Sequence, residues 1–160
     1  MSNMWRFIFS VLILLGTLAL NPKTVLVQSQ TTTSECQPFP FIGGIDNFPE
    51  VEGRSDQQEL WALVFRNPAP FEINEAIKIV WRMTGSGTFN IAARHSDGTM
   101  IDPIWGPEEH GGSTWDRPGD EWGTGFRFPK AGCWRITVTR GNATGEVDFL
   151  VIDSNKLEFF

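Results

Sequence analysis

The fold is decided by residues 123–153, GTGFRFPKAGCWRITVTRGNATGEVDFLVID, in which three apolar segments are separated by two turns rich in Gly, Pro and Asn. The middle segment, Cys133 to Arg140, alternates along its length, with Trp134, Ile136 and Val138 on one face and mainly polar side chains on the other. Such alternation is typical of a strand with one face in a core and the other in solvent. The stretch therefore predicts consecutive antiparallel strands.

Similar segments continue upstream of this stretch. In Ala76 to Met83 (AIKIVWRM), Ile77, Ile79 and Trp81 share one face, whereas Lys78 lies on the other. The predicted strands are, in chain order, Gln58–Arg66, Ala76–Met83, Thr88–His95, Thr99–Ile104, Gly123–Phe128, Cys133–Arg140 and Glu146–Asp153. Short strands with turns at a spacing of about 8–12 residues are typical of an antiparallel sandwich. We therefore predict an all-β, antiparallel β-sandwich.

Composition restricts the class of protein. The chain has 160 residues, of which 41% are hydrophobic and 20% are charged, as expected of one packed domain rather than a disordered chain. Its 13 Lys and Arg against 19 Asp and Glu give a formal net charge of −6. With a pI near 4.9, the chain lacks the positive stripe that nucleic-acid binding requires. We therefore predict no nucleic-acid partner.

The N-terminal residues resemble a secretory signal. An apolar run from Phe7 to Leu20 follows Arg6, and its length suits a signal-peptide core but falls short of the roughly 20 residues that span a bilayer. Val27 and Ser29 suit cleavage after Ser29. We predict a secreted or extracytoplasmic chain with a signal peptide over 1–29, an extended arm over 30–56 and a sandwich domain over 57–160. The alternative is an uncleaved segment that tethers the chain to a membrane, the one membrane contact that we predict.

The two cysteines, Cys36 and Cys133, both follow the predicted signal peptide. An even pair in an oxidising compartment suggests one disulfide, and the alternative is two free thiols. If Trp134 faces the core, Cys133 points outward, and the disulfide would hold the N-terminal arm across the outside of a sheet. His95 and His110 share no close ligand spacing with either cysteine. We therefore predict no metal site from these residues.

One segment resembles a known class of domain. Phe126 to Thr139 (FRFPKAGCWRITVT) resembles the late hairpin of immunoglobulin-like domains, where a Gly-containing turn leads into a strand that opens with a large aromatic side chain. In those domains the aromatic ring plugs one end of the sandwich. Trp134 stands where they often carry Tyr, so the resemblance does not imply a hydroxyl-mediated corner bond here. The resemblance implies an immunoglobulin-like β-sandwich.

A second likeness covers most of the chain after the signal. The segments LWALVF (Leu60–Phe65), KIVWRM (Lys78–Met83), GTFNIAARHSDG (Gly87–Gly98) and GTGFRFPKAGCW (Gly123–Trp134) are similar to a group of uncharacterised secreted bacterial proteins. Those proteins share an early cysteine, a central W-R segment and a terminal G-x-x-F-x-F-P-x-x-G-C-W signature. The likeness implies export, a sandwich and a disulfide between the two cysteines. It implies no activity.

The most irregular connection is Ile101 to Trp122, IDPIWGPEEHGGSTWDRPGDEW, and such connections in compact domains are often functional. It contains six candidate ligand-binding residues: Trp105, Trp115, Trp122, Asp116, Asp120 and Glu121. Exposed indole rings stack on the apolar face of a pyranose, and carboxylates accept hydrogen bonds from sugar hydroxyls. Either these residues form a glycan-binding surface, or the tryptophans fold inward as a satellite core under the loop.

The same carboxylates suggest other chemistry. A glycosidase needs two carboxylates about 5 to 10 Å apart in a cleft, and a small single sandwich leaves little room for one. Asp116, Asp120 and Glu121 could bind calcium, but the loop lacks the D-x-[DN]-x-[DN]-G pattern. The local grouping of His110, Ser113 and Asp116 is no triad signal, because serine triads are assembled across a fold. We therefore predict no catalytic residues, no metal and no cofactor.

These observations predict an exported, non-enzymatic recognition or structural module whose partner is a glycan or another extracellular protein. The alternative is an accessory or inhibitory domain that acts through protein contacts. An acid–base hydrolase is a third hypothesis, and it would depend on Asp116 or Glu121.

Overall fold

The computed structural model describes residues 37–66 and 70–159. The predicted signal peptide, 1–29, and Cys36 of the predicted disulfide lie outside the described residues, so both remain predictions. Across these two ranges, no helix has the length and apolar character needed to cross a membrane.

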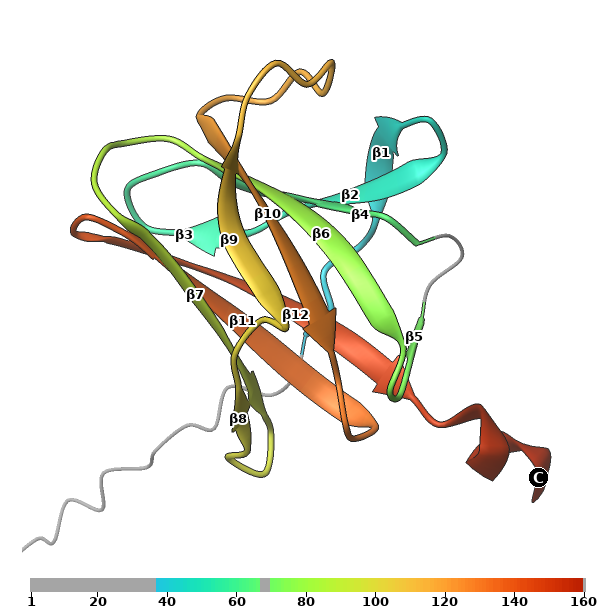
Figure 1. The fold of residues 1–160 in the computed structure, drawn as a ribbon. Helices are drawn as coiled ribbons and strands as arrows, with labels where there is room; N and C mark the ends of the chain where they lie inside the picture. The colour runs from blue at the N-terminus through green and yellow to red at the C-terminus, as the bar shows by residue number, and fades with distance from the viewer. Residues whose placement is uncertain (1–36, 67–69, 160) are drawn as a thin grey trace, which may run out of the picture. The chain divides into compact units, whose positions relative to one another are not determined.

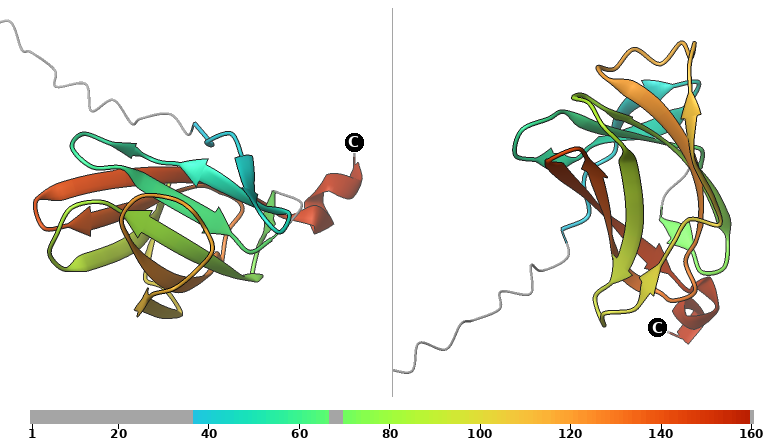
Figure 2. Two further views of the ribbon diagram at one scale, coloured as in Figure 1. Left: turned by 90° about the horizontal axis from the view of Figure 1, so that it is seen from above. Right: turned by 60° about the vertical axis from the view of Figure 1, so that its left-hand side comes forward.

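The described residues form two β-sheets packed face to face (Figures 1 and 2). Sheet 1 has the strand order β1 (Ile42–Ile45), β2 (Phe48–Glu52), β4 (Leu60–Val64), β6 (Ala76–Met83), β10 (Asp120–Arg127), β9 (Trp105–His110). Sheet 2 has the order β3 (Arg54–Ser55), β12 (Ala143–Ile152), β11 (Gly132–Arg140), β7 (Phe89–His95), β8 (Met100–Ile101). The short strand β5 (Phe71–Glu72) pairs with β12 in parallel, and the 3-10 helix η1 (Ser154–Phe159) follows β12. The predicted all-β antiparallel sandwich is confirmed.

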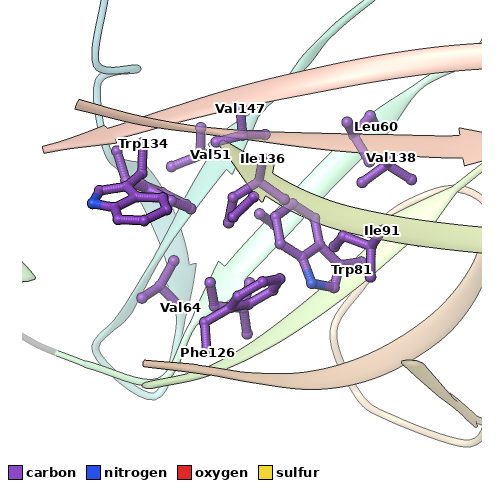
Figure 3. Close-up of a cluster of buried hydrophobic side chains, with 14 of the residues drawn as sticks. Val51, Leu60, Val64, Trp81, Ile91, Phe126, Trp134, Ile136, Val138 and Val147 are labelled. Carbon is purple, nitrogen blue, oxygen red and sulfur yellow. The ribbon is translucent and has the colours of Figure 1, made fainter. Parts of the chain in front are cut away.

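Strand alternation builds the core between the sheets. Figure 3 shows Trp81, Phe126, Trp134 and Ile136 inside this cluster of buried side chains. The faces predicted to point inward on β6, β7 and β11 are the buried faces: Ile77, Ile79, Trp81, Met83, Phe89, Ile91, Ala93, Trp134, Ile136 and Val138. The core indole of Trp81 donates through Nε1 to Oγ1 of Thr124 at 2.8 Å. This pairing removes the penalty of an unsatisfied buried donor.

Trp134 packs beside the turn that precedes β11. Its side chain is fully buried, and its ring centroid lies 5.3 Å from that of Phe128 and 5.0 Å from that of His95. Its Nε1 donates to the carbonyl of Lys130 at 2.9 Å. An indole N–H thus makes a side-chain-to-backbone bond at the turn that precedes β11.

Residues 42–55, which the sequence predicts as part of an extended arm, form the strands β1, β2 and β3. Strand β2 pairs with β4 in sheet 1, and β3 pairs with β12 in sheet 2. The chain changes sheets at Gly53, where an added Cβ would lie 2.8 Å from Cδ2 of Leu60. Short strands interrupted by Gly43, Gly44 and Pro49 carry too little alternation to be recognised in the sequence.

The arm upstream of β1 runs beside β12, between the parts of that strand that pair with β3 and with β5. The backbone N–H of Phe39 donates to the carbonyl of Asp148 at 3.3 Å. The carboxylate of Asp148 is fully buried on the outer side of sheet 2, where Arg135 and Arg54 approach its oxygens at 2.7 and 3.2 Å. Burial raises the pKa of Asp148, but hydrogen bonds from Arg135 and Arg54 outweigh burial and hold that pKa below its ordinary value.

Candidate functional site

The irregular connection predicted over Ile101 to Trp122 is shorter in the structure. It contains β9, an edge strand that pairs with β10, and β10 itself begins at Asp120. The loop between these strands comprises residues 111–119, seen at the top of Figure 1. Every residue of β9 (WGPEEH) is exposed, so its sequence shows no apolar alternation and does not predict a strand.

Trp122 belongs to the main core. Its ring stacks on Phe89 with the centroids 4.2 Å apart and the planes inclined by 12°. The guanidinium of Arg140 lies 4.8 Å from the centroid of the Trp122 ring. Arg140 is itself buried and pairs with the carboxylate of Asp120. Trp122 is therefore a core residue, and Asp120 is engaged by an arginine that joins the two sheets.

Trp115 forms a satellite core on the outer face of sheet 1. It is 5% exposed and packs with Trp61, Leu63 and Val80, which point outward from β4 and β6. The loop of residues 111–119 thus folds back over the sheet and turns outward strand positions into buried ones. Of the two predicted alternatives, a binding surface or a satellite core, Trp115 therefore shows the satellite core.

A buried carboxylate anchors this loop. Glu50 of β2 is 2% exposed and accepts hydrogen bonds from Nε1 of Trp115 at 2.7 Å and from Nε of Arg117 at 3.0 Å. The Arg117 guanidinium also lies 4.0 Å from the centroid of the Trp61 ring. Hydrogen bonding from Arg117 lowers the pKa of Glu50 against the opposing effect of burial, with a further contribution from Trp115.

Glu121 is the centre of a second buried network. Its Oε2 accepts from Nε of Arg82 at 2.8 Å and from Oγ of Ser113 at 2.5 Å, and Nδ1 of His110 lies 2.5 Å from its Oε1. Burial raises the pKa of Glu121, but the hydrogen bonds from Ser113, Arg82 and His110 outweigh burial and hold the pKa below its ordinary value. Glu121 is therefore ionised at neutral pH and acts as an acceptor.

Trp105 is the candidate tryptophan that stays at the surface. It is 37% exposed, at one edge of sheet 1. A Cβ added to Gly125 would lie 1.9 Å from Nε1 of the Trp105 ring, and one added to Gly123 would lie 3.3 Å from Cζ3. These glycines point outward from β10, because Trp122 and Phe126 point into the core. The indole therefore lies along β10 in the space that two missing side chains leave.

A groove lies on the same outer face, between the β1–β2 hairpin and the loop of residues 111–119. Its volume of about 140 Å³ leaves room for one ring of a ligand rather than for a polymer. Its lining combines apolar and polar side chains: Ile45, Asp46, Phe48, Leu63, Phe65, Lys78, Val80, His110, Ser113, Thr114, Trp115 and Glu121. Such a mixture of apolar lining and a few polar groups is typical of small-ligand sites.

The six predicted site residues therefore do not form one site. Trp115 and Glu121 line the groove, Trp105 lies on the same face at the edge of the sheet, and Asp116 is exposed in the loop. Trp122 and Asp120 are engaged in the core and in the ion pair with Arg140.

Sequence reasoning missed the half of the groove contributed by the strands and the β1–β2 hairpin. Val80 gave a usable signal, because it is apolar at an outward position of an otherwise alternating strand. Phe48 gave none, because its short strand lies among Gly and Pro residues.

Comparisons with protein families, curated proteins and solved structures gave no match to this chain.

Proposed function

We propose that this chain is an exported, non-enzymatic recognition module that binds a saccharide on the outer face of sheet 1. The observation that carries the proposal is Trp105, a partly exposed indole that lies across Gly123 and Gly125 on the same face of sheet 1 as the groove. An indole seated on a flat backbone keeps its outer face open for stacking against the apolar face of a pyranose.

The register of the strands supports a binding face that includes both Trp105 and the groove. Gly123 of β10, which lies under the Trp105 ring, is opposite Val80 of β6, and Val80 is opposite Leu63 of β4. Leu63 in turn faces Glu50 of β2. Strands in a sheet are about 4.8 Å apart, so β9 and β2 are separated by four spacings, about 19 Å. Val80, Leu63 and Glu50 of this row are buried with Trp115. The surface offered to a ligand is therefore the Trp105 ring together with the groove.

The carboxylates of the loop and of the start of β10 support the non-enzymatic part of the proposal. Glu121 is ionised and accepts three hydrogen bonds, so it has no proton to donate as a general acid. Asp120 is paired with Arg140, and Asp116 is exposed in the loop. A glycosidase would need one of its two carboxyl groups to stay protonated near neutral pH.

Export and a Cys36–Cys133 disulfide belong to the same proposal. Cys133 is partly buried and lies opposite the exposed Leu150 on the outer side of sheet 2. The backbone N–H of Gln37 lies 3.4 Å from Oδ2 of Asp148, so the described arm passes along β12, the strand that carries Leu150. Thiol labelling of the unfolded chain should modify both cysteines after reduction and neither before it. Labelling without reductant would reject the disulfide.

The test of saccharide binding is a titration followed by tryptophan emission. The purified chain should show a saturable shift with one class of soluble oligosaccharide, and Trp105→Ala should weaken the affinity at least tenfold while the circular dichroism spectrum stays unchanged. Trp61→Phe is the matched control, because Trp61 is buried under Arg117 and does not line the groove. Equal affinity of the Trp105→Ala variant and the wild type would reject Trp105 as the stacking residue.

A second candidate function is a contact with another protein. Met100 and Ile104 are 59% and 52% exposed, and they flank the connection from sheet 2 to Trp105. Two exposed apolar side chains so close in the chain favour a protein contact at this edge of the sandwich. Crosslinking from cysteines placed at these two positions would identify such a partner. Saccharide binding with no partner crosslinked there would reject this second function.

A further inference from the structure

The rim of the groove carries a lysine without an acidic partner. Nζ of Lys78 lies 4.4 Å from the centroid of the Phe65 ring, which lines the same groove. Within 37–66 and 70–159, no carboxylate lies within ion-pair distance of Lys78, whereas Lys130 and Lys156 each have an aspartate partner. In a chain with six more acidic than basic groups, an unpaired cation held over an aromatic ring is suited to an anion from outside.

His110, which also lines the groove, offers a hydrogen-bond acceptor rather than a positive charge. Its Nδ1 lies 2.5 Å from Oε1 of Glu121, and an ionised carboxylate can only accept a hydrogen bond. In the neutral form of the imidazole the proton is therefore on Nδ1, and Nε2 is left as an acceptor. The side chain of His110 is 50% exposed, so a ligand can reach that atom. A hydroxyl group is the complementary donor.

These groups together define a ligand, and we propose that the groove binds a uronic acid residue that carries a single carboxylate. This inference rests on the proposed saccharide function and names its ligand class. The pyranose packs against the apolar part of the lining, in which Phe48 and Phe65 are stacked on each other, its hydroxyls donate to Nε2 of His110 and to Asp46, and its carboxylate pairs with Lys78. The net charge of −6 and the carboxylate of Asp46 at the rim disfavour a densely charged polyanion.

The experiment compares two disaccharides that differ in one group. Cellobiouronic acid carries a carboxylate where cellobiose carries a hydroxymethyl group. Isothermal titration calorimetry with the purified full chain at low ionic strength should give about fivefold tighter binding of the acid, since one partly exposed ion pair contributes about 1 kcal/mol. Lys78→Gln should abolish the preference. Lys130→Gln should retain it, because Lys130 lies in a separate exposed pair with Asp97.

A second variant separates the role of the His110 acceptor from the role of the Lys78 cation. His110→Phe keeps a ring but removes the acceptor, so it should weaken the acid and the neutral sugar by the same factor. Equal binding of both sugars by the wild type would overturn the uronic acid inference and leave saccharide binding in place. A preference that survives in Lys78→Gln would overturn the role of Lys78. Binding of neither sugar, nor of any longer acidic oligosaccharide, would overturn both the inference and the proposed function.

Discussion

Replacing Trp115 by Ala tests whether the loop of residues 111–119 is part of the folded core. The side chain is 5% exposed, so folding removes nearly all of its surface from water. An aromatic side chain buries about 200 Å², which at about 25 cal/mol per Å² is an upper limit near 5 kcal/mol. The loop can collapse over the space, and this reduces the effect.

The polar contacts of Trp115 change the expected loss of unfolding free energy little. Its Nε1 donates to Glu50 at 2.7 Å, and losing this donor costs about 1 kcal/mol. Arg117 still pairs with Glu50 after the substitution. We therefore expect Trp115→Ala to lower the free energy of unfolding by about 3 kcal/mol and the melting temperature by about 10 °C.

Urea unfolding followed by far-ultraviolet circular dichroism measures this change without depending on the fluorescence of the deleted ring. Trp105→Ala is the matched control: Trp105 is 37% exposed, so the same area rule gives an upper limit near 3 kcal/mol and, with a similar reduction, an expected loss of about 2 kcal/mol. A loss below about 1 kcal/mol for Trp115→Ala, or a loss no larger than that of the control, would show that the loop is not part of the stability of the fold.

Three further outcomes are expected. In Gly125→Ala, the new Cβ would lie 1.9 Å from Nε1 of Trp105; the ring should leave its seat and saccharide affinity should fall at least tenfold, whereas Gly111→Ala, with nothing within 4 Å of the new Cβ, should bind as the wild type in the same titration. Because the pKa of Glu50 is lowered from 4.5 in the folded state, its stabilising effect is complete above about pH 4.5 and is lost as the pH falls through the folded pKa. Glu50→Gln should therefore show a smaller loss of unfolding free energy between pH 7 and pH 3 than the wild type, and an unchanged loss would contradict this. Trp134→Phe removes the indole donor that a carbonyl four residues upstream accepts; it should lower the unfolding free energy by about 2 kcal/mol in urea titrations, and a neutral result would reject this bond as stabilising.

The core strands could be predicted from the sequence because their alternation is strict. Ala76–Met83 was predicted with the bounds that the structure shows, and Cys133–Arg140 missed one residue at its start. In both strands one face meets the opposite sheet along its whole length. A two-residue period is then the direct result of burial on one side.

Strands that bury neither face could not be predicted from the sequence. Strand β9 is exposed on both faces, so hydrogen bonding to β10 alone defines it. Strand β1 is mainly exposed and contains two adjacent glycines. Neither carries an apolar period, because neither buries a face.

The candidate site was predicted in part because composition shows aromatic rings but not their direction. The same connection contains Trp105, Trp115 and Trp122, and the structure gives them a surface position, a satellite core and the main core, respectively. Their different positions result from tertiary contacts. Trp105 lies over Gly123 and Gly125, which are distant from it in the chain and become neighbours through strand pairing.

The inward and outward residues of strand β10 are under different selective constraints. Trp122, Thr124 and Phe126 point into the sandwich, where any change in volume affects folding. Gly123 and Gly125 point the other way and shape the seat of Trp105. Under the proposed function, mutations at Gly123 and Gly125 of this strand and at Lys78 of β6 would alter which saccharide is bound without disturbing the interior. Relatives of this protein could diverge in ligand preference along one face while their cores stay alike, and an engineer could diversify that face as a library.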